Sequence, residues 1–188
     1  MMFDGLVRNL GPAPVATLQA MLPAISEAVW LGDPFRQQAF QVHRQTRSLI
    51  FRHIPGDDPA ASQDLPPLLA WKDRLRPVLD AVSAQFGPGQ CRRIMLASLP
   101  PGCQITPHKD HGEAYARTHR VHVPLQTDPG VRFLVDGEDF HLEAGIIYEV
   151  NNLLEHGVVN NGEVDRVHLI VDYLEDADRS GTTGDDLQ

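Results

Sequence analysis

The second half of the chain, from Cys91 onward, consists of short strand-like runs separated by glycine, proline, asparagine and aspartate. These runs read RRIMLASL, HRVHVPLQ, VRFLV, DFHLEA, IIYEV and RVHLIVDYL. Several short strands with turn residues between them are typical of an antiparallel barrel or sandwich, including the jelly roll. We therefore predict a mainly β fold with flanking helices, in which residues 89–174 form the jelly-roll core.

The first part of the chain, residues 1–88, has a mostly helical pattern. Apolar residues recur at helical spacing between Leu18 and Val29, but Pro23 inside this run indicates a kink or two shorter helices. A second amphipathic helix is expected over about Pro66 to Phe86, with Asp64 as its possible cap. These helices are expected to pack outside the β core.

Three further segments complete the predicted organisation. Residues 47–54 (RSLIFRHI) have the composition of a strand, and residues 55–64 form a loop that is either a lid or a solvated connection. Residues 175–188 are acidic and rich in small residues, so we expect a disordered tail. With 188 residues in all, the rest of the chain is expected to be one domain, residues 1–174.

Charge and hydropathy exclude several classes of partner. The chain has 16 basic and 25 acidic residues, a formal net charge of −9, which would repel a nucleic-acid backbone. We find no leader-like start and no apolar stretch long enough to span a membrane, so we expect a cytoplasmic protein. Cys91 and Cys103 are the only cysteines, and a bridge between them is not expected because the turn between their strands would place them apart.

The run TPHKDHG, residues 106–112, contains a potential metal-binding pair. In an extended segment residues i and i+2 point to the same side, so His108 and Asp110 can bind one ion. A second histidine from a distant strand would complete a 2-His-1-carboxylate triad, which leaves positions open for co-substrate and dioxygen. His156 is the best candidate for this third ligand, and His111 is expected to be a near neighbour of the ion.

Arg166 follows His156 by ten positions and begins the apolar strand RVHLIVDYL. A guanidinium group facing a cavity from such a strand is costly unless an anion pairs with it. Its bidentate geometry suits a carboxylate such as the distal one of 2-oxoglutarate. The alternative is a surface arginine paired with Glu163 or Asp165.

Strand HRVHVPLQ carries a second polar pair. Alternation places Arg120 and His122 on one face, which predicts either a pocket lining or an exposed face. In a pocket, Arg120 would hold a carboxylate of the substrate or one end of the co-substrate, and His122 would bind the co-substrate acid. We assign no role to the histidines that are more often satisfied in a core or on a surface, which are His43, His53, His119 and His141; His168, on the same face as Arg166, is an intermediate case.

The segment from Cys91 to Leu174, with PPGCQITPHKD, HRVHVPLQ, the NNLLEHG run and RVHLIVDYL, resembles the aspartyl/asparaginyl β-hydroxylase family of Fe(II)/2-oxoglutarate dioxygenases. The resemblance implies a double-stranded β-helix, the cupin-like jelly roll, with iron at its mouth. It also implies Fe(II) as the metal, with 2-oxoglutarate and dioxygen as co-substrates.

The resemblance implies that His108 and His156 are the family's two metal-binding histidines and that Arg166 is its oxoglutarate-binding arginine. It also implies that Arg120 and His122 are the family's Arg-x-His pair on one strand. Two features depart from the vertebrate peptidyl hydroxylases of the family. This chain has Asp110 where those enzymes carry a glycine, and Ala97 where they carry a hydroxyl residue that helps to hold oxoglutarate. In keeping the full triad, this chain is more similar to bacterial relatives such as the cis-4-proline hydroxylases, which act on a free amino acid, than to the vertebrate enzymes.

The function predicted from these residues is hydroxylation of an amino acid or of an aspartyl/asparaginyl-type side chain, with no catalytic residue beyond the metal ligands. The expected substrate is a small molecule or peptide that carries a carboxylate; the sequence indicates nothing about oligomeric state. Two alternatives are a cupin-like metal-binding protein and a metal-dependent hydrolase or isomerase that uses the same His-Asp-His site. A non-catalytic sensor of small acids is a third, less favoured because all three ligands are present.

Overall fold

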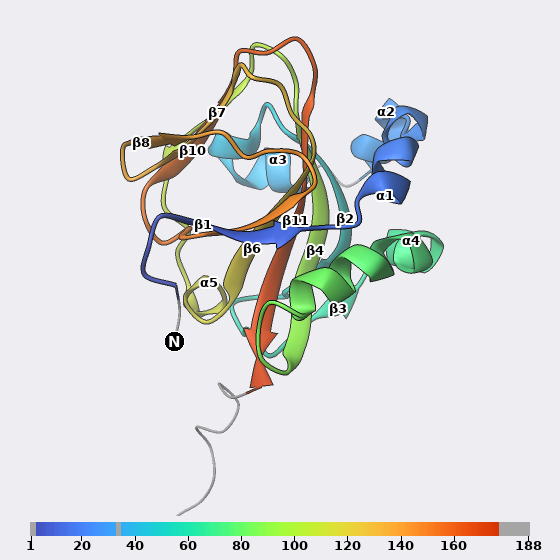
Figure 1. Ribbon diagram of the computed structural model, residues 1–188. Helices are drawn as coiled ribbons and strands as arrows, with labels where there is room; N and C mark the ends of the chain where they lie inside the picture. Colours follow the sequence, from blue (N-terminus) through green and yellow to red (C-terminus); the bar gives the residue numbers. More distant parts are fainter. Residues whose placement is uncertain (1–2, 33–34, 177–188) are drawn as a thin grey trace, which may run out of the picture.

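The computed structural model describes residues 3–32 and 35–176 (Figure 1). Strands dominate after residue 88, and short helices are interspersed with strands before it. The elements in chain order are β1 (Val7–Pro12), α1 (Ala16–Met21), η1 (Leu22–Ala24), α2 (Glu27–Trp30), α3 (Phe35–Ala39), η2 (Gln41–His43), β2 (Arg47–His53), β3 (Gln63–Asp64), α4 (Pro66–Ser83), β4 (Gly89–Leu99), β5 (Gln104–His108), α5 (Glu113–Ala116), β6 (His119–Gln126), β7 (Val131–Val135), β8 (Glu138–Phe140), β9 (Ile146–Val150), β10 (His156–Asn160) and β11 (Arg166–Glu175).

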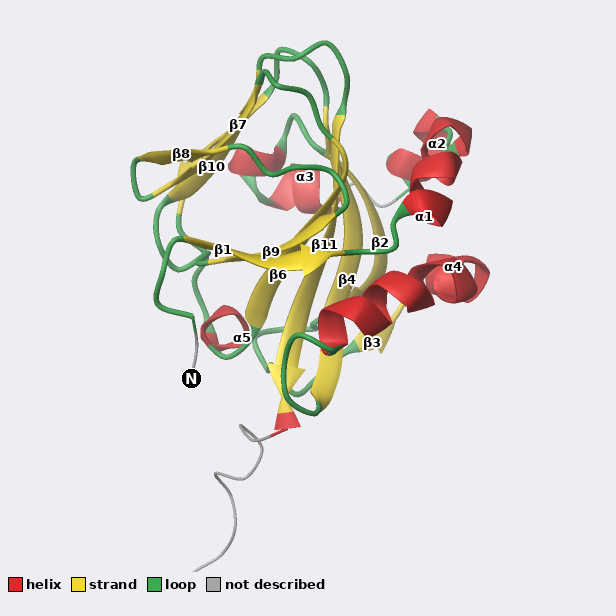
Figure 2. Cartoon of the chain, viewed as in Figure 1, coloured by secondary structure: helices red, strands yellow, loops and turns green. Residues whose placement is uncertain are grey.

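The strands form two antiparallel sheets that face each other, as Figure 2 shows. The larger sheet has the order β1-β9-β6-β11-β4-β2-β3, and the smaller sheet has the order β5-β10-β7-β8. From β4 to β11 successive strands alternate between the two sheets, except that β7 and β8 are paired neighbours in the smaller sheet. This is the winding of a double-stranded β-helix. The predicted mainly β, jelly-roll fold is therefore confirmed.

The two faces of the larger sheet differ in chemistry because strand side chains alternate. On β11, Leu169 and Val171 pack in the main apolar core beneath the helices, whereas Arg166, between the sheets, lines a pocket. On β6, Val121 and Val123 belong to the same core, and Arg120 and His122 line that pocket. The period-2 pattern thus separates the apolar layer beneath the helices from the polar side chains that β6 and β11 direct into the pocket.

Helices α1, α2 and α4 lie together against the outer face of the larger sheet (Figure 1). The first helical run is divided into α1, η1 and α2, as Pro23 indicated. Helix α4 continues through Pro77 and buries Leu75, Val78 and Val82. Asp64 does not cap α4; the residue before the helix is Leu65, and Asp64 instead forms an ion pair with Arg52.

The division into a helical part, residues 1–88, and a strand core, residues 89–174, does not match the sheets. Strands β1, β2 and β3 come from the first part and belong to the larger sheet. Strand β1 was not predicted because its sequence, VRNLGP, is short and contains Asn, Gly and Pro. Its pairing with β9, for example Val7 opposite Val150, makes it a strand.

Three further predictions concern the C-terminal tail, the cysteines and membrane-spanning segments. The segment expected to be a disordered tail, residues 175–188, starts inside β11, which runs to Glu175, and from residue 177 it lies outside the described residues. Cys91 and Cys103 are both free, as expected. Across residues 3–32 and 35–176, no helix has the length and apolar character needed to cross a membrane.

Candidate metal centre

Three predicted ligands meet at one end of the smaller sheet. His108 ends β5, His156 begins β10, and the two residues are directly opposite each other in the antiparallel pairing. Asp110 follows two residues after β5, where its backbone N–H donates to the carbonyl of Asn152 at 3.0 Å. The potential ligand atoms of the three residues all lie within 4.8 Å of one another.

Each histidine is oriented by a backbone contact that leaves one ring nitrogen free. His108 Nδ1 lies 2.9 Å from the Thr106 carbonyl, and His156 Nδ1 lies 3.0 Å from the Leu154 carbonyl. Since a carbonyl only accepts hydrogen bonds, Nδ1 carries the proton in both rings, and Nε2 keeps its lone pair for a metal. This is the arrangement that metal-binding histidines use to fix their tautomer.

Asp110 is held in a similar way through one of its two oxygens. Its Oδ2 accepts a hydrogen bond from Asn152 at 2.9 Å and lies 3.4 Å from the Arg120 guanidinium. Oδ1 lies 3.8 Å from His108 Nε2, on the side of the predicted ion. Burial raises the pKa of this carboxyl, but Arg120, Asn152 and the two histidines outweigh it and bring the pKa to about 2. Asp110 is therefore ionised at neutral pH, as a metal ligand has to be.

Behind Asp110 is a buried ion-pair network that sequence reasoning did not identify. Arg120 Nε lies 2.6 Å from Asp172 Oδ1, and Arg93 pairs with the other oxygen of Asp172 at 3.1 Å. The guanidinium groups of Arg93 and Arg120 also lie over the ring of Tyr115 in α5. Although burial alone would lower it, the Asp172 and Asp110 carboxylates raise the pKa of Arg120. An Asp inside the apolar strand RVHLIVDYL was the available signal for this network.

Arg166 is a buried cation without an acidic partner among the described residues. It is 1% exposed, and its guanidinium donates to Nδ1 of His168 at 2.7 Å and, at 3.5 Å, to Nδ1 of His122. Its Nε has no hydrogen-bond partner. Burial, and then the charge of Arg36, lower the pKa of Arg166 to about 9, so it remains charged at neutral pH. The alternative, a surface arginine paired with Glu163 or Asp165, is wrong, because Arg166 is buried and has an ion pair with neither residue; Asp165 is paired with Arg47.

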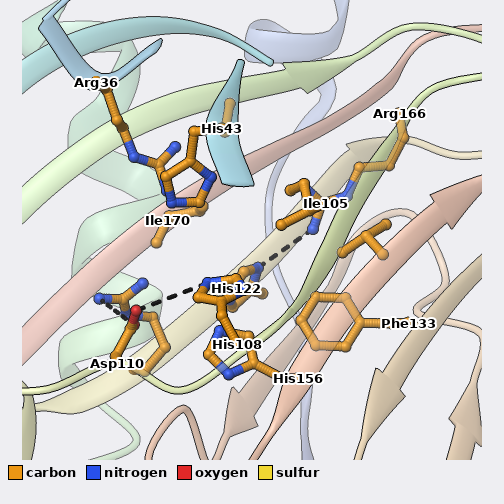
Figure 3. A pocket seen from close by; sticks show the side chains of 13 residues that line it. Arg36, His43, Ile105, His108, Asp110, His122, Phe133, His156, Arg166 and Ile170 are labelled. Carbon is orange, nitrogen blue, oxygen red and sulfur yellow. Dashed lines mark hydrogen bonds and ion pairs between the residues drawn. The ribbon is translucent and has the colours of Figure 1, made fainter. Parts of the chain in front are cut away.

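All six predicted site residues, namely His108, Asp110, Arg120, His122, His156 and Arg166, line one pocket between the sheets (Figure 3). The pocket is open to solvent at its mouth. The expected pocket lining by Arg120 and His122, rather than an exposed face, is therefore confirmed.

Two further lining residues come from the N-terminal part, Arg36 in α3 and His43 in η2. The His43 ring is edge-on to the His108 ring, with 5.5 Å between centroids, although we assigned His43 no role from sequence. Both residues lie in the segment from Asp33 to Phe51, whose sequence resembles the one that precedes the barrel in bacterial relatives, but no motif in it indicates a role in a pocket. Both depend on how the N-terminal segment folds over the barrel mouth.

The remaining histidines lie away from the pocket lining. His111 is exposed, His119 pairs with Glu149, and His53 and His141 contact Gln63 and the Val131 carbonyl. In the segment expected to be a loop over residues 55–64, Gln63 and Asp64 form β3, and no residue of this segment lines the pocket. Instead, Asp57 accepts hydrogen bonds from the first two backbone N–H groups of α5, at 2.7 and 3.0 Å.

The donor set fits a divalent transition metal with open coordination positions. Two neutral imidazoles and one carboxylate are the ligands of the 2-His-1-carboxylate triad, which is typical of non-haem Fe(II) sites. The charged and unpaired Arg166 offers an anion site in the same pocket. A jelly roll with such a centre defines the class of mononuclear metal oxygenases and their metal-binding relatives.

Comparison with known proteins narrows this class. The family model described as aspartyl/asparaginyl beta-hydroxylase matches residues 73–176, more than half of the chain. The protein therefore belongs to the aspartyl/asparaginyl β-hydroxylase family, as the sequence resemblance indicated.

Two relatives illustrate the similarity. An L-proline cis-4-hydroxylase from Rhizobium meliloti (strain 1021) is 25% identical over 118 residues, which cover 62% of this chain and 42% of the relative. The match thus spans about two-fifths of that enzyme. The crystal structure of an oxidoreductase of the 2OG-Fe(II) oxygenase family from Burkholderia pseudomallei superposes with a TM-score of 0.54 at 17% identity, over 69% of this chain and 67% of that one. This structural likeness supports the fold.

Proposed function

We propose that this protein is an Fe(II)/2-oxoglutarate-dependent dioxygenase that hydroxylates an amino acid or an aspartyl/asparaginyl-type side chain. The observation that carries the proposal is Arg166, a charged and fully buried side chain that has no acidic partner among residues 3–32 and 35–176, in the pocket that also holds the triad. An unpaired buried charge is costly, and a bound dicarboxylate would remove that cost. Family membership supports the same reaction type.

In this proposal His108, Asp110 and His156 bind Fe(II), while Arg166 and His122 bind 2-oxoglutarate. Bound Fe(II) and 2-oxoglutarate would supply the oxidising chemistry, in which dioxygen and 2-oxoglutarate give succinate, CO2 and the hydroxyl group of the product. The protein's own side chains position these groups and exclude water. We propose no further catalytic residue.

Arg120 was expected to bind a substrate carboxylate. Its two ion pairs, with Asp110 and Asp172, favour a role in holding the metal ligand Asp110 instead. A substrate carboxylate at Arg120 would have to compete with both of these carboxylates.

We propose that the protein acts in the cytoplasm on a small molecule or peptide that carries a carboxylate. We propose no nucleic-acid partner and no membrane partner. Residues 1–174 would act as one domain, since strands from both parts of the chain share the larger sheet. A cupin-like metal-binding protein, or a hydrolase or isomerase with a metal-bound water, would have no use for the buried Arg166. We therefore do not favour these alternatives.

Succinate formation by anaerobically purified protein tests the proposal. The protein is given Fe(II), 2-oxoglutarate, ascorbate and oxygen, alone and with pools of amino acids, including L-proline, or of Asp- and Asn-containing peptides. We expect 2-oxoglutarate-dependent succinate that rises with one pool and disappears in His108→Ala. Absence of succinate with every pool, together with tight zinc or manganese binding, would favour the metal-binding or hydrolase alternative.

A further inference from the structure

Arg36 is a second guanidinium group in the pocket without an acidic partner among the described residues, and its side chain is half-buried. Its Nη2 donates to His43 Nε2 at 3.0 Å, and its Nη1 is buried without a hydrogen-bond partner. Because His43 Nε2 accepts this bond, the proton of the neutral ring is on Nδ1, which is also buried and unpaired. Two adjacent lining residues therefore present N–H groups that lack an acceptor.

The charge of Arg36 persists in this environment. Burial, followed by the charges of Arg120 and Arg93, lowers the pKa of Arg36 to about 10, so the guanidinium group is charged at neutral pH. Its Nη1 and the neighbouring His43 Nδ1 can together donate to an anion.

The charge balance of the pocket leads to the same expectation. Among the lining residues there are three arginines, Arg36, Arg120 and Arg166, and one acidic residue, Asp110. Asp172, which pairs with Arg120, also pairs with Arg93. Asp172 and Arg93 together add one negative and one positive charge, so they do not change the balance of the pocket. Fe(II) and 2-oxoglutarate carry opposite charges of equal size, so loading them leaves the excess positive charge in place.

Arg36 and Arg166, the two pocket arginines without an acidic partner among the described residues, lie in different parts of the pocket. Arg166 and Arg36 enter the pocket from different sides in Figure 3, with the metal ligands between and below them. Arg36 is next to the metal through His43, whose ring contacts that of His108. An anion at Arg36 would therefore lie beside the metal, away from the far carboxylate that we assign to Arg166.

We infer that Arg36, with His43, binds a carboxylate of the substrate, and that the substrate is a carboxylic acid whose buried part is net anionic. This inference rests on the proposed function and names its substrate class. A buried ammonium group would find only Asp110 as a carboxylate in the lining, and that residue is a metal ligand. An amino group of the substrate would therefore remain outside the pocket.

Binding of simple acids to the anaerobic protein tests the inference. The protein is first loaded with Fe(II) and saturating 2-oxoglutarate, whose binding is followed by the visible absorption of the complex. Aliphatic acids from acetate to valerate, and the corresponding amides, are then titrated by calorimetry and thermal unfolding. We expect at least one acid to bind and its amide not to bind.

Variants assign that binding to Arg36. Arg36→Gln should weaken the acid at least about tenfold, as expected for a lost charge-assisted hydrogen bond, without changing 2-oxoglutarate affinity. Arg36→Lys should keep part of the binding. Arg44→Gln, an exposed arginine one residue after His43, is the matched control and should behave as the original protein does.

Two results would overturn the inference alone: acids that bind Arg36→Gln as tightly as the original protein, or no acid that binds the loaded protein more tightly than its amide. Failure of 2-oxoglutarate itself to bind the Fe(II)-loaded protein would instead overturn the proposed function, and this inference with it.

Discussion

Asn152 is expected to control metal affinity although it is not a ligand. It is 4% exposed, its side-chain amide donates to Asp110 Oδ2 at 2.9 Å, and its carbonyl accepts the Asp110 backbone N–H at 3.0 Å. In Asn152→Ala the backbone contact can persist, whereas the side-chain bond is lost. The remaining donor to Oδ2 is Arg120, at 3.4 Å. The free carboxylate can then rotate away from the ion.

The size of the effect follows from the chemistry of the lost bond. A hydrogen bond to a charged group contributes about 1.5–3 kcal/mol, which corresponds to roughly a 10- to 150-fold change in an equilibrium constant. Loss of contacts that orient a ligand typically lowers metal affinity by about 10- to 100-fold. We therefore predict that Asn152→Ala binds Fe(II), or Co(II) as a spectroscopic substitute, 10- to 100-fold more weakly.

The neighbouring residue provides the control. Asn151 donates its side-chain amide to the carbonyls of Phe3 and Gly5 and does not contact Asp110, so Asn151→Ala should retain metal affinity. Affinities are measured by titrating Co(II) into metal-free protein and following its visible absorption, with thermal unfolding as a check on the fold. Equal affinity of the two variants would show that Arg120 alone is sufficient to hold Asp110, and the reasoning would be refuted.

Two other predictions concern Arg166 and the buried histidines. Arg166→Gln should weaken 2-oxoglutarate binding by about 2 kcal/mol or more, roughly 30-fold, measured by titration of the Fe(II) protein. The control is Arg47→Gln, which removes the ion pair with Asp165. An equal loss of affinity in both variants would show that Arg166 does not bind 2-oxoglutarate. The folded-state pKa values of His43, His122 and His168 are lowered, by burial and then by the arginine nearest to each. Below an unfolded pKa of about 6.5 only the unfolded chain takes up these protons, so stability is complete above that pH and falls as the pH decreases. Between pH 7 and 5.5 the loss should be about 1 kcal/mol for each of these histidines in urea unfolding of metal-free protein, and His168→Phe should reduce the total loss by about 1 kcal/mol. A free energy of unfolding that does not change over this range would contradict the prediction.

The strands of the core could be predicted because their pattern is local. Alternation on β6 and β11 separates Val121 and Leu169, which face the helices, from His122 and Arg166, which face the pocket. The His-x-Asp spacing, a distant histidine before a glycine and an arginine ten positions later were sufficient to select residues that the fold brings into one pocket, the candidate metal and oxoglutarate residues. These features depend on chemistry within a few residues, so sequence alone determined the fold class and the candidate centre.

Contacts between distant segments required the tertiary structure. Strand β1 exists because β9 offers it an edge, and a short VRNLGP segment has no strong preference of its own. Asn152 and Asp172 support the site only because the fold brings them to Asp110 and Arg120. No residue near Arg36 in sequence marks it as part of the pocket. Sequence determined which groups could carry the chemistry, and tertiary packing decided which of them are buried, paired or left without a partner, because desolvation and ion pairing depend on neighbours that come from the whole chain.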